Sequence, residues 1–81
     1  MNEMLLFRAR LAEHKKRLSE METRADSFIS IIREIIDPWS GDFTDFDMDR
    51  ALVMMNDFHA LWQEARTLRA LIAKMEKELR G

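Results

Sequence analysis

The sequence predicts an all-α protein, an antiparallel two-helix hairpin whose stem pairs as a coiled coil. Two long runs of mainly apolar residues alternate in steps of three and four, which is a heptad pattern. The single Pro and one of the two Gly stand in the short segment between these runs. The chain has 81 residues and no Cys, so it has room for one domain and no disulfide. We therefore expect residues 1–81 to form a single helical-hairpin domain.

The first run predicts a helix over about residues 2–37. Its seam starts with Met4 at a and Phe7 at d, and it continues unbroken to the end of the run. His14 is the only polar residue of this seam, and a polar seam residue helps to fix the register of two helices. The main core positions that we expect in this helix are Leu11, His14, Leu18, Phe28, Ile32 and Ile35.

The segment between the runs predicts a loop over about residues 38–45. Pro38 disfavours helical geometry at the residue before it, and Gly41 supplies conformational freedom for a turn. Side-chain oxygens that accept from free backbone N–H groups are typical of helix starts. The candidate N-caps for a second helix are Thr44, Asp45 and Asp47.

The second run predicts a helix over about residues 46–80. Its seam starts with Ala51 at a, and its main core positions are Phe58, Leu61, Leu68 and Ile72. A short connection makes consecutive helices antiparallel neighbours, in which a positions face d positions. A fold point at residue 43 then places Phe28 opposite Phe58, Leu18 opposite Leu68 and His14 opposite Ile72. On the outer g positions, the same register places Arg24 across from Glu64.

The e positions that border the seam change character along the stem. Near the termini they are charged, whereas near the loop they are apolar, and further apolar residues widen this half. A contiguous apolar surface marks a contact with a partner, and a second copy is the simplest partner. We therefore expect a homodimer that forms a four-helix bundle with its contact centred on Trp62; another helical protein is the alternative partner. The expected interface residues are Ile29, Ile31, Ile36, Leu52, Met55 and Trp62.

The sequence indicates no metal, cofactor or catalytic site. Three aspartates alternate in the segment DFDMD, as in a calcium loop, but Arg50 and Asn56 stand where that motif needs Gly and Glu. Neither His is preceded at three residues by Glu, which a di-metal site in a helical bundle uses. Capping of the second helix explains the aspartates, and we expect a protein without enzymatic activity, catalytic residues, cofactors or bound metal.

Charge and hydropathy restrict the partners and the compartment. The net charge is −2, so there is no overall attraction to nucleic acid or to an anionic membrane. Residues 37–57 hold six Asp and one Arg, which makes the middle of the chain acidic, whereas residues 58–81 are mildly basic. The N-terminal apolar run is too short for a signal peptide, and no stretch has the length of a membrane span. We expect a cytoplasmic protein without membrane contact.

Trp39, Ser40 and Gly41 form a W-x-G triplet between the two predicted helices. This arrangement resembles the WxG family of small secreted helical hairpins. The resemblance implies a dimeric four-helix bundle that leaves the cell by a specialised secretion system without a cleaved signal peptide. The sequence departs from that family because it has no Tyr for the C-terminal secretion signal and because Pro38 precedes Trp39. A purely structural explanation is also open. Trp39 falls at the next heptad position a after Ile35, where its ring would plug the end of the core.

These observations predict a self-associating hairpin that acts through protein–protein contact, as an adaptor, assembly factor or accessory factor. The first alternative is a secreted hairpin resembling the WxG family. The second alternative is an accessory factor that binds nucleic acid through basic residues of the first helix. Glu13 and Glu20 interrupt this basic face, so the sequence favours a solvated coiled-coil surface there. The basic residues are Arg8, Arg10, Lys15, Lys16 and Arg17.

Overall fold

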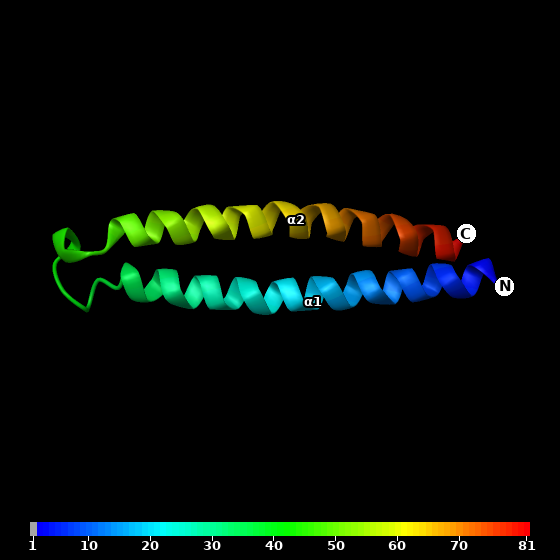
Figure 1. Ribbon diagram of the computed structural model, residues 1–81, viewed down its shortest axis with the longest axis horizontal. Coiled ribbons are helices and arrows are strands. Elements are labelled where there is room, and N and C mark those ends of the chain that lie inside the picture. Colours follow the sequence, from blue (N-terminus) through cyan, green and yellow to red (C-terminus); the bar gives the residue numbers. More distant parts are fainter. Residues whose placement is uncertain (1) are drawn as a thin grey trace.

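The computed structural model describes residues 2–81 and consists of two long helices that pack side by side (Figure 1). Helix α1 spans Glu3–Ile35 and helix α2 spans Met48–Arg80, with 33 residues in each. A short 3-10 helix, η1, spans Phe43–Asp45 in the connection. The principal extents are 62 × 18 × 15 Å, so the molecule is a rod. The prediction of an all-α two-helix hairpin is confirmed.

Both ends of α1 follow from local chemistry. At its start, the Asn2 side chain accepts hydrogen bonds from the amides of Met4 at 3.0 Å and Leu5 at 3.4 Å. At its end, α1 terminates at Ile35, about two residues before the predicted boundary. Pro38 restricts the residue before it to extended geometry, so the last helical turn cannot continue through Asp37. The Ile36 amide still donates to the Ile32 carbonyl at 3.1 Å and closes the helix.

The loop is built from short-range hydrogen bonds to aspartates. The Asp37 carboxylate accepts from the Trp39 amide at 3.0 Å, and its carbonyl accepts from the Ser40 hydroxyl at 2.9 Å. Gly41 then adopts a φ of 155°, which residues with a Cβ atom rarely adopt. Asp42 starts η1 by accepting from the amide and the hydroxyl of Thr44, each at 3.0 Å.

Asp47 is the candidate cap that α2 uses, since its carboxylate accepts from the Arg50 amide at 3.2 Å. Thr44 and Asp45 belong to η1, which the sequence pattern did not predict. The expectation that Trp39 plugs the end of the core is wrong. Trp39 is 93% exposed, because α1 has already ended at Ile35 and the chain turns away from the seam before it reaches the indole.

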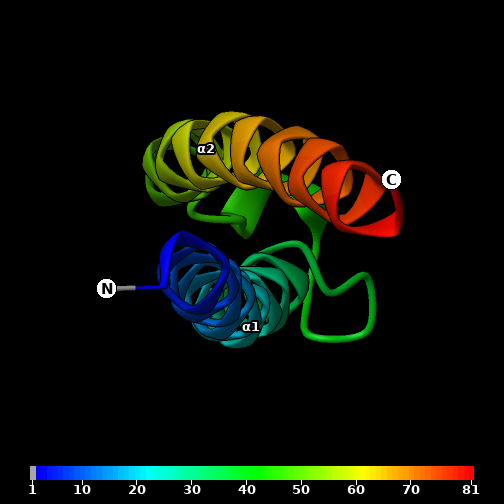
Figure 2. The same ribbon diagram turned by 90° about the vertical axis from the view of Figure 1, so that its right-hand side faces the viewer.

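The core is a single seam of side chains between the two helices. Half-buried residues complete it, among them Phe7, His14, Leu18, Phe28, Phe58 and Leu79. The rings of Phe28 and Phe58 stack with centroids 5.7 Å apart, which places these two residues at the same level of the stem. Figure 2 shows the pair along its axis, with the second helix as the only long element against the first among residues 2–81. The buried residues are Leu11, Met21, Ile32, Ile35, Ala51, Leu61, Leu68, Ile72 and Met75.

Two ion pairs connect the helices on opposite flanks. Lys15 Nζ lies 3.6 Å from Glu76 Oε1, and Arg17 Nη2 lies 3.8 Å from Glu64 Oε1. Glu64 thus contacts Arg17 instead of the predicted Arg24. In an antiparallel pair each g residue lies between two g residues of the facing helix. The Arg17 guanidinium contacts the one of these two that carries a carboxylate, Glu64. The four side chains are 35% to 63% exposed, so each pair contributes only about 0–1 kcal/mol.

Candidate protein interaction surface

One flank of the hairpin, near the loop, carries a cluster of exposed apolar side chains that we call the loop-half flank. Their exposed fractions range from 40% for Ile29 to 62% for Leu52. The e positions nearer the termini are instead Arg8, Lys15, Arg69 and Glu76, so this flank changes from apolar to charged along its length. The loop-half flank consists of Ile29, Ile36, Met48, Leu52, Met55 and Trp62.

The helical repeat explains why these residues share one flank. On α2 they recur in steps of four, three and seven, at e and b positions, which form one stripe beside the seam. Ile29 on α1 and Ile36, the residue that follows its last turn, occupy e positions, and e positions of antiparallel helices border the same side of the seam. Five of the six expected interface residues therefore lie together. The sixth, Ile31, is half-buried at a g position, on the other side of the stem.

Trp62 is held in a defined orientation on this flank. Its ring stacks against that of His59, with centroids 5.4 Å apart and planes 29° from parallel. The guanidinium carbon of Arg66 lies 4.9 Å from the indole centroid, which is a cation–π distance. His59 and Arg66 are three residues before and four residues after Trp62, so both belong to the same stripe of α2. The indole nevertheless remains 47% exposed.

An open hollow lies next to Trp62 on the side away from the loop. Its lining consists of Trp62, Arg66, Arg69, Ala70 and Ala73, and its volume is about 530 Å³. The two alanines leave space that longer side chains would fill, and the two arginines give the hollow a positive charge. The hollow can therefore receive an apolar group that is accompanied by carboxylates. The sequence pattern was not interpreted as a hollow, although the spacing of Trp62, Arg66 and Arg69 in steps of four and three places them on one face of the helix.

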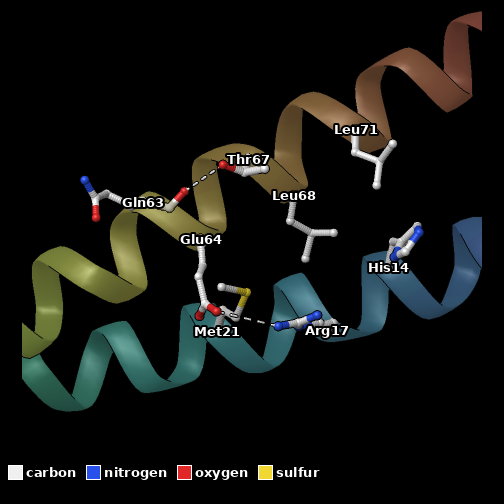
Figure 3. A pocket seen from close by; sticks show the side chains of 8 residues that line it. All are labelled: His14, Arg17, Met21, Gln63, Glu64, Thr67, Leu68 and Leu71. Carbon is white, nitrogen blue, oxygen red and sulfur yellow. Dashed lines mark hydrogen bonds and ion pairs between the residues drawn. The ribbon is translucent and has the colours of Figure 1, made fainter.

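A second groove, on the opposite flank, gives no comparable surface (Figure 3). It measures about 440 Å³, and His14 and Met21 of α1 face Leu68 and Leu71 of α2 across it. The ion pair of Arg17 with Glu64 crosses its edge, and the Thr67 hydroxyl donates to the Gln63 carbonyl at 3.1 Å. The side chains of Arg17, Glu64 and Thr67 are therefore already engaged within the hairpin.

The basic residues of α1 are only partly free. Arg8, Arg10, Lys15, Lys16 and Arg17 are all exposed, but Lys15 and Arg17 pair with glutamates of α2. A continuous basic face, which nucleic-acid binding requires, is thus interrupted by carboxylates of the second helix as well as of the first.

Residues 2–81 bring no three metal-ligating side chains together in a cluster. Neither helix described by the structure combines the length and the hydropathy that crossing a membrane requires. No family model, curated protein or solved structure matches this chain. The resemblance to the WxG hairpins therefore remains limited to the Trp39–Gly41 triplet and the helical hairpin.

Proposed function

We propose that this protein is a non-enzymatic helical hairpin that self-associates through the loop-half flank and acts by protein–protein contact. The supporting observation is the gathering of six half-exposed apolar side chains on the loop half of one flank. A role as adaptor, assembly factor or accessory factor is compatible with such a module. The proposal makes the apolar flank the functional site and assigns no catalytic residue.

Burial of the loop-half flank against a second copy would lower the free energy of the protein. Complete burial of a large apolar side chain stabilises by roughly 1.5–3 kcal/mol, so covering a half-exposed one contributes about 1 kcal/mol. Six such side chains in each copy then offer several kcal/mol to an association, which is a large share of the stability of a small domain. The isolated hairpin buries only the single seam between its two helices, and small chains without disulfides or metals commonly depend on oligomerisation for stability.

Sedimentation analysis of the unmodified protein at micromolar concentration tests this proposal. We expect a dimer whose dissociation at lower concentration is measurable. The double variant Ile29→Glu with Trp62→Glu should sediment as a monomer or unfold, because it places two charges on the apolar flank. Circular dichroism distinguishes those two outcomes, and both agree with the proposal.

A matched control uses apolar residues that are equally exposed elsewhere. Val53 is 56% exposed at a c position and Leu71 is 42% exposed at a g position, both on the side of α2 that faces away from the loop-half flank. The double variant Val53→Glu with Leu71→Glu should remain dimeric. A stable monomer for the unmodified protein, or equal loss of the dimer in both double variants, would contradict the proposal.

A further inference from the structure

We propose that two copies dimerise antiparallel about Met55, so that the acidic loop of each copy covers the hollow formed by Trp62, Arg66 and Arg69 of the other. This inference rests on the proposed self-association and adds its orientation, its register and a polar contact. Its starting point is the stripe on α2, in which apolar residues toward the loop are followed by two arginines toward the C-terminus.

The apolar residues of the α2 stripe lie at nearly equal spacings on either side of Met55. The stripe can therefore pair with the same stripe of a second copy that runs in the opposite direction. In a two-fold contact, residue i meets residue j and residue j meets residue i. With Met55 on the axis, Met48 of one copy meets Trp62 of the other, and Leu52 comes within one residue of the level of His59. All the apolar side chains of the stripe are then covered. A contact centred on Trp62, as the sequence alone suggested, would place Met48 opposite Glu76 and Met55 opposite Arg69, so apolar side chains would face charged ones.

Charge selects the antiparallel orientation over the parallel one. Residues 37–57 hold six Asp against one Arg. A parallel dimer would bring two such acidic loops together, and like charges at close range repel. In the antiparallel dimer about Met55, the residues that precede Met48 reach the level of Arg66 and Arg69 of the other copy. Opposite charges then meet at both ends of the contact, which favours this orientation.

The loop also carries side chains whose chemistry suits the hollow. Phe43 is 75% exposed on η1, and aspartates flank it at Asp42 and Asp45. The hollow combines an alanine floor with two guanidinium groups and an indole whose orientation is fixed by His59 and Arg66. An aromatic ring accompanied by carboxylates is complementary to that lining. The exposed loop and the open hollow, which lie far apart within one hairpin, thus become neighbours between two copies.

Single-cysteine variants test the orientation, because the natural chain contains no Cys that could interfere. Met55→Cys should form a disulfide-linked dimer readily, since the two thiols lie on the axis. Ser40→Cys alone should not, whereas a mixture of Ser40→Cys with Ala70→Cys should give the mixed dimer. Efficient self-crosslinking of Ser40→Cys in a protein that sediments as a dimer would overturn the antiparallel arrangement and leave self-association intact.

Charge reversal tests the polar contact. Arg66→Glu with Arg69→Glu should weaken the dimer by about tenfold or more, because each of the two symmetric contacts loses its attraction. Adding Asp42→Arg and Asp45→Arg, which reverse the two aspartates beside Phe43, should restore most of the affinity. The control Lys74→Glu with Lys77→Glu changes the net charge equally on outward positions and should leave the affinity within about threefold. Equal weakening by both reversals, without restoration, would overturn the proposed contact. A protein that never dimerises would refute the self-association itself.

Discussion

Replacement of Leu61 by Ala tests whether the single seam holds the hairpin together. Leu61 is 5% exposed, and Ala25 of α1 packs against the buried cluster that contains it. The substitution removes three carbon atoms, which corresponds to about 2.5 kcal/mol of transfer free energy. The cavity that remains adds to this loss, because Ala25 is too short to extend into the gap. We expect the free energy of unfolding to fall by about 3 kcal/mol.

Leu71 supplies the matched control for this experiment. It lies on the same helix and is 42% exposed, so Leu71→Ala should cost about 1 kcal/mol or less. The change in helix propensity is the same for both variants and cancels in the comparison. Urea unfolding followed by circular dichroism, at one fixed protein concentration, measures both losses. Equal losses for Leu61→Ala and Leu71→Ala would refute the assignment of Leu61 to a packed core.

Two further predictions concern the register and the loop. Cysteines at Leu18 and Leu68 should form a disulfide within one chain, whereas cysteines at Leu18 and Met75 should not; the reverse result would show that the helices are shifted by a heptad. Hydrogen bonds from the amide and then from the hydroxyl of Thr44 lower the pKa of Asp42 from its ordinary value of 3.8. The resulting stabilisation is present above that ordinary value and is lost as the pH falls through the lower folded-state pKa. The Thr44 amide resonance should therefore titrate with a midpoint below 3.8, and a midpoint at or above it would contradict this.

The long helices were predictable because one physical signal repeats along them. Each heptad adds another apolar residue to the same seam, so the pattern from Phe7 to Ile35 and from Ala51 to Leu79 leaves little choice of fold. The stacked rings of Phe28 and Phe58 are paired as the heptad register predicts. The apolar flank near the loop was predictable for the same reason, because the e positions follow the same heptad repeat.

The loop and the outer side chains were less predictable because their geometry depends on single contacts. The early end of α1 comes from Pro38 and removes Trp39 from the seam, although Trp39 still has the heptad spacing of an a residue. Arg17 contacts Glu64 because long exposed side chains choose between neighbouring partners of similar energy. The orientation of Trp62 between His59 and Arg66 had a signal in the spacing, but spacing alone does not fix how a ring is turned.

The placement of the helix ends has a mechanical consequence. Helix α1 begins and α2 ends at the same end of the rod, opposite the loop (Figure 1). A force that pulls these two ends apart acts across the seam, so it loads one layer of side chains at a time. The two helices would separate first at Phe7 and Leu79, and then one layer after another toward the loop. A force applied between one terminus and the loop would instead run along the backbone of one helix and leave the seam unloaded, so the resistance of the stem depends on where it is pulled.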